Sequence, residues 1–267
     1  MPAVLILSSF VAASRVGGSA QAAALERMGV RAILVPTVTF GRHPGLGDPG
    51  GAPVPDATFK GMLAGVEAAG GLDELSAVIC GYFASPGQVA AAVRTIGKVR
   101  IASPAAPVIA DPIMGDLETG LYVKEAVAEA IANDLVHAAD ILTPNAWELA
   151  RLTGRPAGDL AEVQAAAKAL GGTALISSVP LDGEIGVLLT SPDGEILARH
   201  LRAPATPKGT GDLLVAAFVG ALAEGGSLSE ALMIATAEVA AVATGHAIEV
   251  TVERLSGEPH AAALADD

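Results

Sequence analysis

The sequence predicts an α/β fold: a doubly wound domain with a mostly parallel central sheet, helices on both faces and a late β-hairpin. Short aliphatic runs alternate with helix-length segments along most of the 267 residues. Hydrophobic residues make up 51% of the chain but aromatic residues only 3%, so the core must be aliphatic and closely packed. The turn signal Ser191-Pro192-Asp193-Gly194 separates two strand-like runs late in the chain. We expect one domain spanning residues 1–267.

The aliphatic runs have the length and the flanking residues of buried strands. Runs of a few apolar residues bounded by Gly, Pro, Ser or Asp are typical of strands that are covered on both faces. We expect strands at residues 3–7, 32–36, 77–80, 108–110, 141–142 and 174–176, and hairpin strands at 185–190 and 196–203.

Helical segments lie between these strands. We expect helices at residues 18–28, 86–96, 124–135, 145–152 and 161–170, then two long helices at 211–224 and 228–245. Residues 41–55 are rich in Gly and Pro and predict a long irregular loop. Loops of this length often serve as binding loops or lids.

The apolar N-terminal segment needs an interpretation. Residues 3–13 resemble the apolar part of a signal peptide, but no Lys or Arg precedes them and Ser8 and Ser9 interrupt them early. We therefore expect a buried first strand. The longest apolar stretch, residues 213–223, is too short to span a bilayer. These features, with a single cysteine, predict a cytoplasmic protein with no membrane segment.

The charge balance excludes several function classes. Lys and Arg total 16 against 29 Asp and Glu, which gives a net charge of −13. This acidity argues against nucleic-acid binding and against adhesion to anionic lipid. The single cysteine, Cys80, excludes an intramolecular disulfide and a cysteine-rich zinc site. Phosphate binding stays open, because loop amides and helix N-termini bind phosphate without a basic surface.

The sharpest local motif is Gly209-Thr210-Gly211-Asp212, which follows the predicted hairpin and opens an apolar helix. Two glycines allow a tight turn that directs backbone N–H groups and the helix dipole at one point, which forms an anion hole. A carboxylate at its mouth can accept the proton of an attacking hydroxyl. The alternative is that the motif only caps its helix, with Asp212 satisfying free amides.

Two further motifs follow neighbouring strands. Asp111 begins Asp-Pro-Ile-Met-Gly after one strand, and Asn145 and Glu148 lie in Thr-Pro-Asn-Ala-Trp-Glu after the next. Asn145 and Glu148 share one face of a starting helix, and ligands of open α/β sheets bind beyond the carboxyl ends of the strands. Asp111 and Glu148 could hold a hydrated Mg²⁺. The alternative is that Asp111 caps a loop and the other two residues cap their own helix.

Together these motifs resemble those of the ribokinase superfamily of small-molecule kinases and, within it, the pyridoxal kinases. The order and approximate spacing hold from residue 4 to about residue 246. The Gly-x-Gly-Asp motif alone assigns the superfamily, whereas other pieces point to vitamin B6 kinases. Those pieces are Ser9, Gly17-Gly18-Ser19, Thr37-Val38-Thr39-Phe40 with His43, Gly81-Tyr82 with Ser85, and the motifs that begin at Asp111 and Thr143.

The resemblance implies a role for each matching residue. Asp212 is the catalytic base, and Gly209, Thr210 and Gly211 form its anion hole. The remaining implied roles are substrate binding for Ser9, Thr37, Tyr82 and His43, phosphate-side binding for Asn145, Ser177, Ser178 and Lys208, and metal binding for Asp111 and Glu148. For Tyr82 ordinary half-buried packing is the alternative, and for His43 a solvated loop position.

The resemblance also implies an activity and its partners. The expected reaction is transfer of the γ-phosphate of ATP, with Mg²⁺, to the 5′-hydroxymethyl group of pyridoxal or another B6 vitamer. A homodimer is expected, and a monovalent cation is left open. The alternatives are a hydroxymethylpyrimidine kinase and a non-catalytic binder of pyridoxal phosphate. A sugar or nucleoside kinase is disfavoured, because no early strand pair resembles the lid of the sugar kinases.

The chain departs from the family pattern near its first strand. It has Ser9-Phe10-Val11 where the family usually has Ser-His-Val, and Ala13-Ser14 where a Tyr-Gly pair is expected. Loss of that aromatic ring reshapes the ring pocket. The departures leave the choice among the B6 vitamers and related pyrimidines open, but they do not touch the motifs for phosphoryl transfer.

Overall fold

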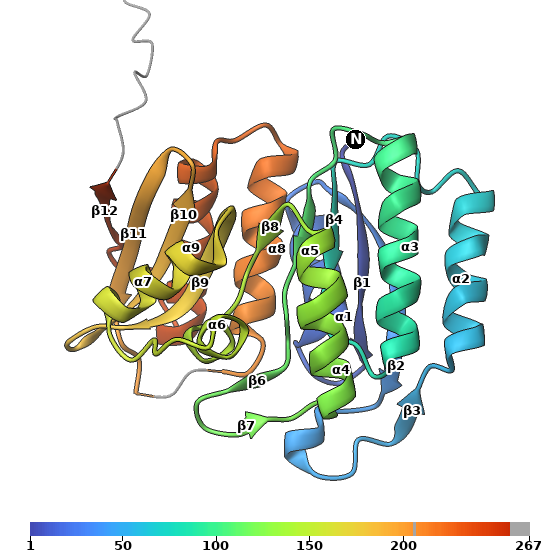
Figure 1. Ribbon diagram of the computed structural model, residues 1–267, viewed down its shortest axis with the longest axis horizontal. Helices are drawn as coiled ribbons and strands as arrows, with labels where there is room; N and C mark the ends of the chain where they lie inside the picture. Colours follow the sequence, from blue (N-terminus) through green and yellow to red (C-terminus); the bar gives the residue numbers. More distant parts are fainter. Residues whose placement is uncertain (205–206, 257–267) are drawn as a thin grey trace, which may run out of the picture.

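The computed structural model describes residues 1–204 and 207–256 and contains a ten-stranded sheet with helices on both faces (Figure 1). Its strand order is β12-β11-β10-β9-β8-β5-β4-β1-β2-β3. These strands are β1 Ala3–Val11, β2 Arg31–Phe40, β3 Gly51–Pro53, β4 Ala77–Cys80, β5 Val108–Ala110, β8 Ile141–Leu142, β9 Thr173–Pro180, β10 Glu184–Ser191, β11 Gly194–Leu201 and β12 Thr251–Ser256. A second, two-stranded sheet pairs β6 (Gly115–Asp116) with β7 (Gly120–Leu121).

The pairing confirms the predicted fold class. The central strands β2, β1, β4, β5, β8 and β9 run parallel to one another. Strands β10 and β11 form the predicted late hairpin, which closes at the Ser191–Gly194 pair. Strand β9 pairs antiparallel with β10, and β12 adds antiparallel to β11. The sheet is therefore parallel where the helical crossovers are and antiparallel at its ends.

The helices occupy the segments between the strands. They are α1 Gly17–Arg27, α2 Asp56–Ala68, α3 Pro86–Ala102, α4 Glu125–Ala130, α5 Val136–Ala138, α6 Ala146–Thr153, α7 Leu160–Leu170, α8 Thr210–Ala223 and α9 Leu228–Thr244. A π-helical turn at Ile131–Leu135 joins α4 to α5, and a 3₁₀ turn, η1, spans Pro44–Leu46. In the residues that the structure describes, no helix has the length and apolar character needed to cross a bilayer.

The core lies in two layers, one on each face of the sheet. Successive residues of β1 point to opposite faces, so Leu5 and Leu7 join one layer while Val4 and Ile6 join the other. The first layer packs against α2, α3, α4, α6 and α7, and the second against α1, α8 and α9. All four β1 side chains are fully buried. This is the near-continuous apolar strand expected of a doubly covered parallel sheet, and it confirms the interpretation of the N-terminal segment.

Several elements differ from the sequence-based expectation. Residues 41–55 are wrongly predicted as one irregular loop, because η1 forms within them and β3 pairs antiparallel with β2. Helix α2, strand β12 and the β6–β7 pair were not predicted. The strands β1, β2 and β9 also run several residues beyond their apolar runs. In each of these cases, polar or small residues adopt regular structure because a neighbouring strand supplies the hydrogen bonds or a neighbouring helix supplies the packing.

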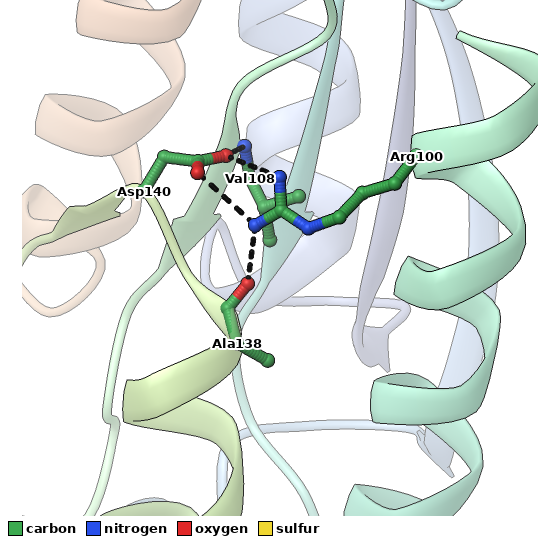
Figure 2. A network of polar contacts seen from close by, with 4 residues as sticks. All are labelled: Arg100, Val108, Ala138 and Asp140. Atoms are coloured by element: carbon green, nitrogen blue, oxygen red, sulfur yellow. Dashed lines mark hydrogen bonds and ion pairs between the residues drawn. The ribbon is translucent and has the colours of Figure 1, made fainter. Parts of the chain in front are cut away.

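A polar network fixes the edge of the sheet at which β5 and β8 begin (Figure 2). The Arg100 guanidinium, near the end of α3, donates to the Asp140 carboxylate at 3.0 Å and to the Ala138 carbonyl at 2.8 Å. Asp140 also accepts the Val108 backbone N–H at 2.8 Å. The network joins α3, α5 and the starts of two central strands. The network therefore stabilises the N-terminal edge of the sheet, which is the edge opposite the carboxyl ends of β5 and β8.

Candidate active site

The candidate residues meet at the carboxyl edge of the parallel strands. Asp111 directly follows β5, Thr143 directly follows β8, and Asp212 lies in the first turn of α8. In Figure 1 the β6–β7 hairpin and the segment with η1 and β3 lie at this same lower edge. Polar groups from segments far apart in the chain are therefore brought to one place, as expected for a binding site of an open α/β sheet.

The Gly209 loop supplies the start of α8. Gly209 is the N-cap residue and adopts a left-handed conformation with φ 92°. A Cβ atom at this position would lie 2.0 Å from the Arg15 carbonyl oxygen, so only glycine lets the loop approach the segment between β1 and α1. No side chain caps α8. Its first amides are thus left to bind an anion, as the sequence predicts.

Asp212 stands at the mouth of this anion hole. Its carboxylate is buried, and among the residues that the structure describes its Oδ1 atom has no hydrogen-bond partner. Burial raises the pKa of Asp212 to about 6, although the nearby Gly17 N–H acts in the opposite direction. A buried polar atom without a partner is costly and is retained mainly where a ligand or a reaction uses it. The geometry favours the base over the helix-cap interpretation, and the carboxylate is ionised above about pH 6.

Glu148 holds together the two loops that follow β5 and β8. Its Oε1 atom accepts the Met114 N–H at 2.8 Å, and its Oε2 atom accepts the Asn145 N–H at 3.0 Å. The Asn145 side chain caps α6 in return, accepting the Glu148 N–H, and donates to the Gly115 carbonyl at 2.9 Å. The capping pair that was the structural alternative is therefore present. Burial raises the pKa of Glu148 to about 7.

Asp111 completes a cluster of buried acids. Burial raises its pKa well above the usual range, and the carboxylates of Glu148 and Asp212 raise it further, while the Thr143 hydroxyl counteracts them. Two carboxylates that raise the pKa of a third create a site of negative potential around Asp111. In the described ranges 1–204 and 207–256, no group of three or more His, Cys, Asp or Glu side chains has the arrangement of a complete metal site. The arrangement instead fits a cation that completes its shell with phosphate oxygens.

The predicted substrate residues lie on adjacent strand ends. Thr37, fully buried in β2, donates its hydroxyl to the Tyr82 carbonyl at 2.7 Å. The Tyr82 N–H in turn donates to the Ser8 hydroxyl at 3.2 Å. The neighbouring Ser9 hydroxyl packs so closely on Gly17 that a Cβ there would lie 1.8 Å away. Because Gly17 also faces Asp212, Ser9 lies beside the predicted base.

His43 lies at the start of η1 and is tethered to the segment that follows β1. Its backbone N–H donates to the Ser14 hydroxyl at 3.1 Å, and its Nδ1 atom accepts the Gly45 N–H at 3.0 Å. Partial burial lowers its pKa, and the nearby Lys208 charge lowers it further. His43 is therefore a partly exposed loop residue that hydrogen bonds hold in place. Ser14 belongs to the Ala13-Ser14 pair that stands where the family has Tyr-Gly, and its hydroxyl holds this loop by accepting the His43 N–H.

The phosphate-side residues are less tightly gathered. The backbone of Ser177 pairs with that of Asn145 in an isolated parallel β-bridge, and the Ser177 N–H donates to the Pro144 carbonyl at 3.0 Å. Ser178 is exposed and has a positive φ of 58° at an irregularity of β9. The Lys208 ammonium lies 3.9 Å from Glu118 in the β6–β7 turn. The structure thus places Ser177 beside the acid cluster, whereas Lys208 reaches the site from an exposed loop.

Sequence reasoning missed Tyr122, which follows β7. Burial raises its pKa far above the usual range, and the carboxylates of Glu148, Asp111, Asp116 and Asp212 raise it further. Tyr122 is 43% exposed, and its backbone N–H donates to the Met114 carbonyl at 3.0 Å, which places the residue beside the loop that Glu148 holds. No spacing rule could identify it, because the two-residue strand before it is set only by the fold around it.

The raised pKa values predict a pH dependence of stability. A carboxyl group whose pKa is higher in the folded than in the unfolded state binds more protons when folded, so stability falls as the pH rises from about 4 to 7. We expect Asp212→Asn to be more stable than wild type at pH 8 by about 2–3 kcal/mol, since it removes one such group. Urea unfolding at pH 5.5 and pH 8 measures the difference. A variant less stable than wild type at pH 8 would contradict the burial argument.

The fold and the acid cluster beside an anion hole define a phosphotransferase that acts on a small molecule. Comparison with known proteins gives the same answer. Residues 74–256 match the model of the phosphomethylpyrimidine kinase family. The chain is 36% identical to a pyridoxine/pyridoxal/pyridoxamine kinase of Bordetella avium, over 86% of this chain and 80% of that protein. It is 35% identical to a pyridoxal kinase of Deinococcus radiodurans, over 86% of this chain and 82% of that protein.

Solved structures agree with the sequence relatives. A pyridoxal kinase from Leishmania donovani, in complex with ADP and pyridoxamine, superposes with a TM-score of 0.84 at 27% identity, covering 90% of this chain and 85% of that one. The chain belongs to the phosphomethylpyrimidine kinase family and, within it, to the pyridoxal kinases of the ribokinase superfamily. It is a kinase.

Proposed function

We propose that this kinase transfers the γ-phosphate of ATP to the 5′-hydroxymethyl group of pyridoxal, giving pyridoxal 5′-phosphate in vitamin B6 salvage. The observation that carries the proposal is the buried Asp212 carboxylate in the first turn of α8, because one of its oxygens finds no hydrogen-bond partner within residues 1–204 and 207–256. That arrangement offers a proton acceptor and anion-binding amides at one point. The kinase names of the relatives support the same reaction.

The mechanism follows from these positions. Asp212 accepts the proton of the substrate hydroxyl as the oxygen attacks the γ-phosphate. The N–H groups at the start of α8 stabilise the charge on the transferred group, and they need no rearrangement because Gly209 already fixes the turn. The segment that carries His43 lies at the same edge of the sheet and can exclude water, which limits wasteful hydrolysis of ATP.

Mg²⁺ is the cation that the acid cluster fits best. Carboxylate oxygens are the ligands that Mg²⁺ takes from proteins, and Asp111 and Glu148 would hold it together with phosphate oxygens. When bound it would neutralise negative charge on the phosphates. Glu148 is already bonded to backbone amides through both oxygens. We therefore assign it chiefly to orienting the loop after Asp111, with Asp111 as the more direct ligand. A monovalent cation at the same cluster stays part of the proposal.

The metal assignment predicts a shift in the Mg²⁺ requirement. Asp111→Asn removes one negative charge beside the cation, so the Mg²⁺ concentration for half-maximal rate should rise several-fold. The measurement is a Mg²⁺ titration of the rate at saturating ATP. Glu125→Gln, at an exposed acid on α4 that pairs with Arg151, is the control. Identical titrations of Asp111→Asn and wild type would assign Asp111 to structure alone.

A second candidate substrate is hydroxymethylpyrimidine, because the matching family model carries the name of phosphomethylpyrimidine kinase. It is also a flat heteroaromatic alcohol and needs the same chemistry. A panel of pyridoxal, pyridoxine, pyridoxamine and hydroxymethylpyrimidine, each with ATP and Mg²⁺ and read by product mass, separates the two. We expect the fastest turnover with a B6 vitamer. Turnover of the pyrimidine alone would overturn the proposal, and binding of pyridoxal phosphate without any turnover would identify a binder.

The substrate pocket predicts a selective effect of Tyr82. Its ring packs half-buried against the core beyond the end of β4, where it can stack on the vitamin ring. Tyr82→Ala should raise the KM for pyridoxal several-fold and leave the KM for ATP unchanged. Tyr82→Phe keeps the ring and is the matched control, so its KM should stay within about twofold of wild type. An equal rise in both KM values would remove Tyr82 from the vitamin pocket.

The proposal includes an oligomeric state and a location in the cell. We propose a homodimer from the family resemblance, and sedimentation of the purified chain tests it.

We also propose a cytoplasmic location, which the free and buried Cys80 supports because such thiols suit a reducing compartment. Fractionation of cells that express the natural protein tests this location.

A further inference from the structure

Gln88 stands out among the buried polar side chains that have no place in the mechanism. It lies in the first turn of α3 and is fully buried. A buried amide is costly unless its donors and acceptor are paired. All of these groups are paired here, and every partner is a backbone group at the substrate end of the sheet.

The Gln88 amide joins three segments. Its Nε2 atom donates to the Thr37 carbonyl of β2 and to the Val54 carbonyl after β3, both at 2.8 Å. Its Oε1 atom accepts the Ala84 N–H at 2.9 Å. Ala84 lies two residues after Tyr82, and Thr37 bonds the Tyr82 carbonyl directly. One side chain therefore sets the backbone on both sides of the Thr37–Tyr82 pair.

The same helix end also anchors the segment that carries His43. Val54 is the first residue after β3, where this segment rejoins the body of the fold, and its N–H donates to the Thr37 carbonyl at 2.9 Å. The Ser85 hydroxyl, which caps α3, donates to Asp56 at the start of α2. At Gly87 a Cβ would lie 1.8 Å from Asp56 Oδ2, so the Asp56 carboxylate packs directly against this glycine. The start of α3 and the end of the segment are thus packed as one unit.

We propose that Gln88 is a positioning residue for the alcohol substrate: it sets the spacing of Thr37, Tyr82 and the end of the 41–53 segment, without touching the substrate. The inference rests on the proposed function, because it takes Thr37 and Tyr82 as the walls of the vitamin pocket. Its three hydrogen bonds in the described residues go to Thr37, Val54 and Ala84, and none goes to α8 or to the loops after β5 and β8, which form the proposed nucleotide side. Gln88 therefore governs the affinity for the alcohol and not the affinity for ATP.

The test is the KM for each substrate in Gln88→Met, which keeps the length of the side chain but removes every hydrogen bond. Leaving buried carbonyl and amide groups unpaired relaxes the backbone around Thr37 and Tyr82, so the KM for pyridoxal should rise at least about fivefold. The KM for ATP and the kcat at saturating pyridoxal should stay within about twofold of wild type. Gln88→Glu is the second variant, since it keeps the size and the acceptor but loses the two donors, and it should show the same split.

Thr95→Val provides the control for a merely structural role. Thr95 is also buried on α3, and its hydroxyl bonds only the Ala91 carbonyl of the same helix. Its loss should lower the melting temperature without moving either KM. Gln88 variants that fold but keep the wild-type KM for pyridoxal, or that raise both KM values equally, would overturn the inference. Wild-type protein that fails to phosphorylate any B6 vitamer in the same assay would instead overturn the proposed function.

Discussion

Asp212→Asn should lower kcat by about 10²–10⁴-fold while the affinity for ATP stays nearly unchanged. Asparagine keeps the size of aspartate and a polar side chain, but it is neutral and cannot accept the proton of the attacking hydroxyl. In the described part of the chain, the buried Asp212 carboxylate has one oxygen without a partner and makes no capping hydrogen bond to its helix, so its loss should affect the reaction and not the start of α8. Steady-state rates with pyridoxal and a separate measurement of nucleotide binding test this expectation.

The matched control is Glu230→Gln. Glu230 occupies the third position of α9, as Asp212 does in α8, but its carboxylate completes a capping box with Ser227. It should lose helix stability without loss of kcat. If the two variants lose activity to the same small extent, Asp212 acts only on its helix. The pH profile gives an independent test, because kcat/KM should rise with pH through about 6 as Asp212 ionises.

Gly209→Ala should reduce kcat/KM by about 10²-fold or more, because the anion hole depends on a turn that only glycine adopts. Its φ of 92° is strained for any other residue, and the added Cβ would lie 2.0 Å from the Arg15 carbonyl oxygen. The loop must therefore move, which displaces the first amides of α8 from the phosphate. The melting temperature should fall as well, since the left-handed conformation and the contact are both disturbed.

The second glycine of the motif is the control for this experiment. Around Gly211 a Cβ would meet no protein atom within 4 Å, and its backbone is helical. Gly211→Ala should therefore keep the wild-type melting temperature or exceed it, because alanine favours a helix. Thermal unfolding and kcat/KM of the two variants are measured side by side. Wild-type stability and rate in Gly209→Ala would show that the turn tolerates a side chain and that the anion hole lies elsewhere.

The sequence predicted the central strands and the hairpin because their signals are local. Buried parallel strands are continuous apolar runs, and the Ser191–Gly194 turn is a short-range pattern. The elements that it missed carry weak local signals. Strand β3 is three exposed residues that exist only as a partner of β2. Helix α2 buries only Phe59 and Leu63, so its periodicity is faint.

In the candidate site too, some features follow from local sequence motifs and others only from the tertiary structure. The sequence by itself determined where Asp111, Asn145, Glu148 and Asp212 stand, because each follows a strand or opens a helix in a recognisable motif. The tertiary structure alone decided the pKa values of these carboxyl groups and the contacts around them. Burial raises the carboxyl pKa values, the carboxylates of Glu148 and Asp212 raise that of Asp111 further, and Gln88 joins the site through hydrogen bonds across long stretches of chain. Desolvation and long-range hydrogen bonds depend on the distances between segments, and a sequence motif fixes only the order of residues along the chain.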